Sequence, residues 1–203
     1  MQSQVDAALH HAVEASNLQE VTELLASGAG LDRLVGDWTP LHRAAAKGHV
    51  EIAGVLLEAG ASIDIRGAGS WTPLHRAAKL GHEEMTMLLL EWGADVQAQG
   101  IHGWTPLLRA AMAGQANTGR LLIAAGADIK ASNAAQRWTP LHWAAFSGSM
   151  DLVRDLVAAG AEVGPAAGAG RTPLQLAVHY GHDDMAEFLR EHEGDAHAED
   201  LDG

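Results

Sequence analysis

The sequence contains no cysteine, so disulfide bonds, zinc–thiolate sites and cysteine nucleophiles are all excluded. A reducing, intracellular compartment is compatible with this composition. Aromatic residues other than tryptophan are scarce, with two Phe and one Tyr against six Trp. No run of about 18 apolar residues occurs, so we expect no membrane-spanning helix and no membrane partner.

Positive charge is also in short supply, because 13 Lys and Arg stand against 26 Asp and Glu, a formal net charge of −13. Sequence-independent DNA binding depends on neutralising phosphates, so we expect no nucleic-acid partner. The first residues, 1–6, contain neither a basic nor an apolar segment, so no secretory signal is predicted. A cytoplasmic or nuclear location is therefore expected.

One short motif returns at a fixed step along the chain. The sequence Trp-Thr-Pro-Leu-His starts at Trp38, and close copies start at Trp71, Trp104, Trp138 and Arg171. The prolines of these copies are separated by 33, 33, 34 and 33 residues. A period near 33 carrying T-P-L-H-x-A is the signature of ankyrin repeats, in which a turn precedes two short helices. Over about residues 5–193 the chain resembles the ankyrin family.

The resemblance implies an all-α fold, an ankyrin-repeat solenoid of stacked helix-turn-helix units with extended β-turn fingers. A single domain over residues 1–193 is expected, because one helix pair cannot bury its apolar side without neighbours. Residues 194–203 are expected to form an acidic, disordered tail. The expected units are an N-terminal cap (5–37), four repeats (38–70, 71–103, 104–137 and 138–170) and a C-terminal cap repeat (171–193).

The residues of one repeat explain this pattern. Thr39 is a good N-cap, and Pro40 suits the first helical turn, where its missing N–H costs nothing. Gly48 ends the first helix, and Gly60 is a C-cap candidate for the second. The third full repeat departs most from this pattern, since Gly119 in its second helix should cost about 1 kcal/mol relative to alanine. We expect that repeat to open first.

Histidine is abundant, with 12 residues, but most of them belong to the repeat. Family resemblance implies structural roles for these, as bonds to backbone. The most metal-like cluster includes His179, His182 and Asp183, yet Gly181 interrupts the helix between the two histidines. No phosphate-binding loop, nucleophile elbow or His-Glu-x-x-His motif occurs. We therefore expect no enzyme, no metal and no cofactor.

The resemblance also places the residues around the start of each first helix in a concave groove, where partners of ankyrin proteins dock. In this set lie seven of the 13 cations and only two of the 26 carboxylates. The second helices, counted to residue 191, hold 13 carboxylates against three cations. An acidic chain has thus sorted its positive charge onto one face.

Tryptophan and arginine are the residues most enriched in binding hot spots. We predict that they form a ladder for an extended acidic or phosphorylated segment of another protein, with Arg reading the anions. The chain would then act as a monomeric adaptor, scaffold or inhibitor. Three repeats pair Trp with Arg five residues on: Trp38/Arg43, Trp71/Arg76 and Trp104/Arg109. The full predicted partner-binding set is Trp38, Arg43, Lys47, Trp71, Arg76, Lys79, Trp104, Arg109, Met112, Trp138, Trp143, Phe146 and Tyr180.

Two alternatives stay open. In the first, Arg stacks on a neighbouring Trp as a cation–π pair and repeat duplication copied both residues. In the second, the chain reads methylated lysine on histone tails, because Trp138 and Trp143 match the cage positions of certain histone-methyltransferase ankyrin domains. Leu176, where a third Trp is expected, and Phe146, in place of the cage acid, depart from that pattern.

Overall fold

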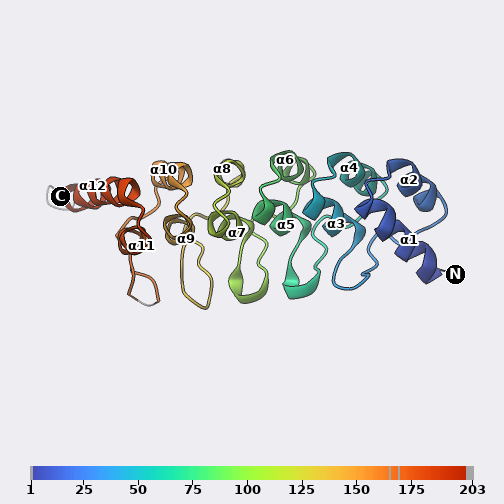
Figure 1. Cartoon of the computed structure of the whole chain (residues 1–203), viewed down its shortest axis with the longest axis horizontal. Coiled ribbons are helices and arrows are strands. Elements are labelled where there is room, and N and C mark those ends of the chain that lie inside the picture. The colour runs from blue at the N-terminus through green and yellow to red at the C-terminus, as the bar shows by residue number, and fades with distance from the viewer. Residues whose placement is uncertain (1, 165, 169, 200–203) are drawn as a thin grey trace. The chain divides into compact units, whose positions relative to one another are not determined.

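The computed structural model describes residues 2–164, 166–168 and 170–199. Within them the chain forms α-helices in six consecutive pairs and no β-strand; Val35 and Trp38 form an isolated bridge. The helix-pair architecture expected from the sequence is confirmed (Figure 1). The bounds are α1 Gln2–Glu14, α2 Leu18–Ala26, α3 Pro40–Lys47, α4 Val50–Glu58, α5 Pro73–Leu80, α6 Glu83–Glu91, α7 Pro106–Met112, α8 Ala116–Ala124, α9 Pro140–Ser147, α10 Met150–Ala158, α11 Pro173–His179 and α12 Asp183–Glu199.

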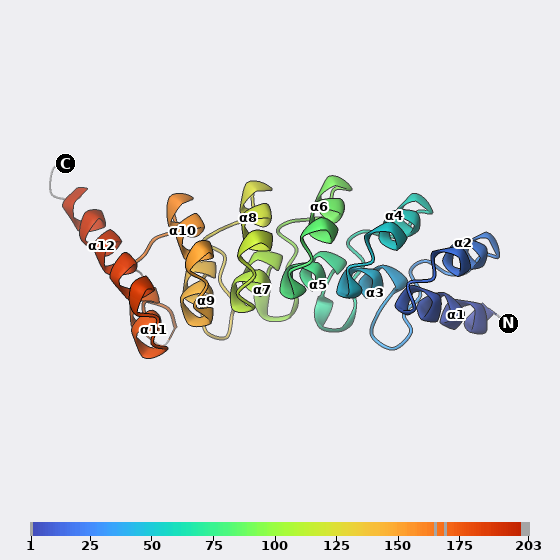
Figure 2. The ribbon, with the colours of Figure 1, turned by 45° about the horizontal axis from the view of Figure 1, so that its top comes forward.

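The chain divides into two compact units, Met1–Ile101 and His102–Gly203, each with three helix pairs. In unit 1 the first helices α1, α3 and α5 pack side by side, and so do the second helices α2, α4 and α6 (Figures 1 and 2). In unit 2, α9 packs between α7 and α11, and α8 packs on α10. The single-domain organisation of residues 1–193 stays a prediction.

The Thr-Pro-Leu-His motif begins each first helix by capping it. At α3, Thr39 accepts a hydrogen bond from the His42 N–H, while Nδ1 of His42 accepts one from the Thr39 N–H. This reciprocal capping box satisfies backbone donors that the first turn otherwise leaves unpaired. The same arrangement recurs at α5 and α9, and with Gln175 in place of His at α11.

The ends of the first helices and the fingers follow from glycine and from backbone pairing. Gly48 ends α3 with a φ of 71°, a left-handed conformation that a side chain would strain. The finger between the second and third helix pairs returns as a tight turn, closed by the Gly67 N–H donating to the Trp71 carbonyl at 2.9 Å. Short 3-10 turns, η1 (Ala68–Ser70) and η2 (Ile101–Gly103), lie in two of the fingers.

The chain ends differ from the expectation. Helix α1 begins at Gln2, ahead of the cap boundary expected at residue 5. Residues 194–199, expected to be disordered, continue helix α12, and residues 200–203 lie outside the described part. Asp183 and Asp184 in the first turn of α12 favour the helix electrostatically. Once a helix is formed, each added residue costs little, so α12 extends through the alanines and glutamate that follow.

Gly119 has a packing role that propensity alone did not reveal. A Cβ at this position would lie 2.5 Å from Cδ1 of Leu152 in the neighbouring helix α10. Leu152 is fully buried, so it has little room to move. The glycine therefore permits the close approach of α8 and α10, and alanine at this position would require Leu152 to shift. That repeat also lacks the capping histidine, since Leu108 takes its place.

Gly54 in helix α4 offers the matched comparison, because a Cβ there would meet nothing within 4 Å. The substitution Gly54→Ala should raise the free energy of unfolding by about 0.5–1 kcal/mol through helix propensity. Gly119→Ala should give no gain or a loss, because Leu152 must shift. Urea denaturation of both variants measures this. An equal gain at the two positions would show that Gly119 has no packing role.

Candidate functional site

A pocket of about 230 Å³ lies in unit 1 where the capping pair meets the first full repeat. Its walls come from helices α1, α3 and α5 and from the turn before α3. Three of its residues are cations and one is a carboxylate, in a chain of net charge −13. The lining residues are Glu14, Trp38, His42, Arg43, Ala46, Lys47 and Arg76.

The tryptophan of this pocket is held between repeats. The Trp38 ring makes an edge contact with His42, with centroids 5.3 Å apart. On the ring lies the guanidinium of Arg76, whose Cζ is 3.3 Å from the centroid. Arg76 belongs to the following repeat, so the cation stacked on Trp38 is not Arg43, although Arg43 lines the same pocket. Arg76 thus stacks on the tryptophan of the preceding repeat, a cation–π contact of the kind described in the first alternative.

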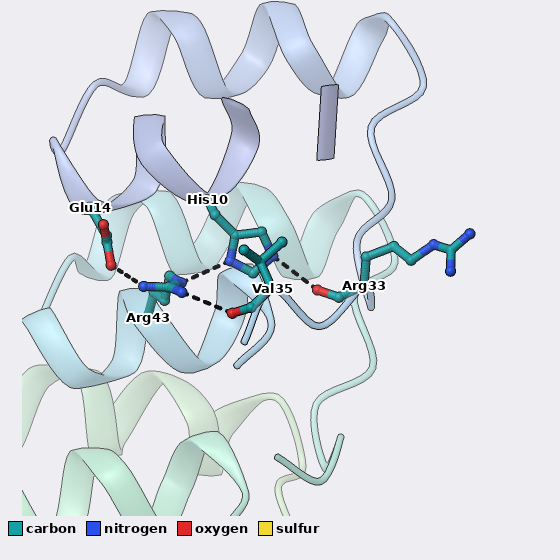
Figure 3. A network of polar contacts seen from close by, with 5 residues as sticks. All are labelled: His10, Glu14, Arg33, Val35 and Arg43. Atoms are coloured by element: carbon teal, nitrogen blue, oxygen red, sulfur yellow. Dashed lines mark hydrogen bonds and ion pairs between the residues drawn. The ribbon is translucent and has the colours of Figure 1, made fainter. Parts of the chain in front are cut away.

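Arg43 instead turns toward the N-terminal cap. Its Nε donates to Nδ1 of His10 at 2.8 Å, and one terminal nitrogen donates to the Val35 carbonyl at 2.9 Å. The other terminal nitrogen forms an ion pair with Glu14 (Figure 3). Figure 3 shows the guanidinium between the Glu14 carboxylate and the His10 ring, while the Arg33 side chain points away. Three residues of the cap therefore contact the Arg43 guanidinium: His10 and Glu14 on helix α1, and Val35 in the finger before α3.

The contact with Arg43 requires a neutral His10. Because Nε2 of His10 faces the carbonyl of Arg33 at 2.9 Å, Nε2 carries the proton and Nδ1 is free to accept from Arg43. Burial lowers the pKa of His10, an effect that the nearby Arg43 charge reinforces; the bond to the Arg33 carbonyl and the carboxylates of Glu14 and Asp6 oppose it. The imidazole therefore acts as an acceptor for the guanidinium.

His42, at the floor of the pocket, is fully buried. Its Nε2 donates to the Trp71 carbonyl of the next repeat at 2.8 Å, and its Nδ1 accepts from the Thr39 hydroxyl at 2.8 Å. Burial lowers the pKa of His42 to about 4, against the opposing effect of the Trp71 bond. With both ring nitrogens engaged, His42 is a structural link between repeats, as the resemblance implied.

The other predicted site residues of unit 1 differ in access. Lys47 is exposed at the pocket rim, and Lys79 is half-buried. Trp71 is half-buried and packs against the next finger, since a Cβ on Gly100 would lie 2.5 Å from its ring. Trp38, Arg43, Lys47 and Arg76 are therefore brought together in one pocket, whereas Trp71 and Lys79 are not among its lining residues.

In unit 2 the predicted residues form a packed aromatic cluster. Trp143 lies 4.9 Å from Trp104 and 4.5 Å from Trp138 between ring centroids, and Phe146 joins this group to Tyr180. Trp143 thus takes the place on Trp104 that Arg76 takes on Trp38. Only 8% of Trp138 and 7% of Trp143 is exposed. Little of either indole is therefore accessible to a partner, because the rings of the cluster pack against one another.

The remaining predicted site residues of unit 2 differ in their exposure to solvent. Arg109, whose Cζ is 5.9 Å from the Trp104 centroid, is half-buried, and burial lowers its pKa. Met112 is also half-buried, and Tyr180 is 44% exposed.

The burial of Trp138 and Trp143 also bears on the methyl-lysine alternative. An aromatic cage must hold its rings apart so that a cation fits within about 6 Å of each centroid. The two rings instead meet edge to face at 4.5 Å. They leave no room for an ammonium group between them, so the structure does not support a reader of this kind.

Sequence reasoning missed the role of two cap residues, His10 and Glu14, as partners of Arg43. In the sequence, His10 stands at the Leu-His site of its unit and Glu14 on the cationic face. The available signal was the isolation of Glu14, one of two carboxylates among seven cations. Opposite charge on neighbouring helices indicates a contact, but the repeat period alone did not show which cation it reaches.

No group of three or more His, Asp or Glu suited to a metal ion occurs in the part of the chain that the structure describes. In the cluster around His179, Nε2 of His182 instead lies 3.4 Å from the Phe146 carbonyl, a link between repeats. Over the same described residues, no helix is both long and apolar enough to cross a membrane.

Comparison with known proteins agrees with the geometry. The family model described as ankyrin repeats (3 copies) matches residues 2–67, 64–133 and 130–200. The matches cover nearly the whole chain and all six helix pairs. No curated protein matches the chain in a direct sequence search.

The lowered pKa of His42 predicts a specific dependence of stability on pH. The pKa of His42 is 6.5 in the unfolded chain and about 4 in the folded one. Between these two pH values, the unfolded chain binds a proton at His42 that the folded chain does not. The free energy of unfolding should therefore fall as the pH falls through this window, by on the order of 3 kcal/mol from this residue. Urea denaturation at several pH values measures the slope.

The control is His42→Gln, because Gln175 already serves as the capping residue of α11. This variant should be less stable at pH 7 but should have a shallower slope between pH 6.5 and 4. The carboxylates contribute equally to the pH dependence of stability in the wild type and in the variant. Identical slopes for wild type and variant would contradict a buried, neutral His42.

Proposed function

The chain belongs to the ankyrin-repeat family, and on that premise we propose that it is an intracellular adaptor, scaffold or inhibitor binding an extended acidic or phosphorylated protein segment. Ankyrin repeats indicate a protein–protein interaction module.

The observation that carries the proposal is the pocket of unit 1. Arg43, Lys47 and Arg76 line it together, with Glu14 as the one carboxylate. A chain of net charge −13 repels acidic ligands at long range, so a local concentration of cations is the feature that could hold one. Charge complementarity of this kind favours specificity and orientation.

The pocket residues suit binding rather than catalysis. Arginine forms paired hydrogen bonds to carboxylate or phosphate, and an exposed lysine adds a mobile point charge. Trp38 offers a flat apolar surface beside them. Both nitrogens of His42 are engaged in hydrogen bonds, so the one imidazole of the pocket has no free position for proton transfer.

The stacking of repeats suggests how a partner segment would be spaced. Packed helices such as α3 and α5 lie roughly 8–10 Å apart. An extended chain advances about 3.3 Å per residue. Acidic residues at about every third position of the partner would therefore meet the cations of successive repeats in unit 1.

Selection from a random peptide display library tests this proposal without a known partner. Peptides enriched on the wild-type protein should carry more Asp and Glu than the input library. The variant Lys47→Glu should weaken an enriched acidic peptide by about ten-fold, because an exposed attraction becomes a repulsion at the pocket rim. Fluorescence anisotropy measures the affinities.

Lys130→Glu is the matched control. Lys130 is also exposed, and its substitution changes the charge by the same amount in a finger of unit 2. It should alter the affinity by less than about two-fold. Enrichment of neutral or basic peptides, or equal loss in both variants, would refute the proposal.

A further inference from the structure

The Arg43 guanidinium is held in place without help from Glu14. Its Nε–H is anchored to the His10 ring at 2.8 Å and one terminal N–H to the Val35 carbonyl at 2.9 Å. Both anchors are neutral acceptors on the cap, and the side chain of Arg43 is only 21% exposed. The remaining terminal nitrogen, the one that meets Glu14, therefore keeps its position when that carboxylate moves.

The contact with Glu14 is the replaceable one. The Glu14 side chain is 42% exposed and lies at the end of helix α1, and it lines the same pocket as Lys47 and Arg76. An ion pair this accessible to water contributes little to folding stability, so another anion can displace it at small cost. Movement of Glu14 into solvent would leave three cations around the vacated position.

We infer that Glu14 is an internal stand-in for the anion of the partner, occupying the edge of Arg43 that an incoming carboxylate or phosphate must take. This inference rests on the proposed function, since it concerns the same pocket. In the unbound chain, Glu14 neutralises part of the pocket and competes with the ligand. Because it is tethered beside Arg43, it competes at a high effective concentration.

Because of this competition, the affinity for an anionic ligand depends on Glu14, although Glu14 itself does not attract the ligand. Binding must release the Glu14–Arg43 pair and bring a second negative charge near the carboxylate. Removal of the charge alone, with the shape of the side chain retained, should therefore strengthen binding. A residue whose role is only to hold the cap onto α3 would have the opposite effect or none.

The experiment compares wild type, Glu14→Gln and Glu51→Gln, using one acidic peptide enriched by the selection described above. Glu51 lies exposed on helix α4 and is not a pocket residue, so its variant has the same net charge without touching the pocket. The peptide is made with Glu, phosphoserine or Ser at its central acidic position. Glu14→Gln should bind the Glu and phosphoserine peptides about five-fold more tightly, and the Ser peptide with little change.

The three peptides distinguish the sources of the anion. A gain with phosphoserine alone assigns the pocket to phosphate, and a gain with both assigns it to either anion. Equal affinity of wild type and Glu14→Gln, or an equal gain in Glu51→Gln, overturns the inference while leaving the proposed function intact. If the wild-type protein enriches no acidic peptide at all, both the proposed function and this inference fail.

Melting of Glu14→Gln by circular dichroism accompanies the binding data. A midpoint close to that of wild type is expected, because His10 and Val35 still anchor Arg43. A strongly destabilised variant with weakened binding would show that Glu14 is a structural part of the cap, and would also overturn the inference.

Discussion

The hydrogen bonds of the His42 ring connect the local and the long-range structure of unit 1. One nitrogen accepts from Thr39 at the start of α3, and the other donates to the Trp71 carbonyl of the following repeat. The same residue therefore begins a helix and sets the position of the next repeat. Because the ring must stay neutral for both bonds, the helix start, the repeat spacing and the pocket above it share one constraint.

This constraint also positions the charged side chains. With the repeats held in register, the residue that follows the capping histidine projects toward the preceding repeat. Arg43 reaches the cap in this way, Arg76 reaches Trp38, and Trp143 reaches Trp104 in unit 2. Where that residue is arginine, the result is a cationic pocket; where it is tryptophan, the result is a buried aromatic cluster. One repeat geometry thus gives two different surfaces.

The fold was predictable from particular residues, and the site only in part. Thr39, Pro40 and Gly48 act through local backbone geometry, so their effects on helix bounds could be inferred directly. The stacking of Arg76 on Trp38 could not be assigned from local geometry, because these residues are 38 positions apart and belong to different repeats.

The packing around Trp138 and Gly119 was also difficult to infer from the sequence. Trp138 was predicted to bind a partner, yet Trp143 of the same repeat packs against it, and only 8% of Trp138 is exposed. Gly119 looked unfavourable by helix propensity, but its neighbour Leu152 lies on another helix pair. Both cases depend on the direction of side chains, which the repeat period does not give.

The proposed binding of an anionic segment places it in the pocket beside Trp38 and Arg43. The most direct measurement is a titration of ¹⁵N-labelled protein with an enriched acidic peptide, following the indole N–H signals and the Nε–H of Arg43 by NMR. Signals of Trp38 and Arg43 are expected to change, with the Arg43 Nε–H remaining protected because its bond to His10 persists. Changes confined to Trp138 and Trp143, with Trp38 and Arg43 unaffected at saturation, would contradict it.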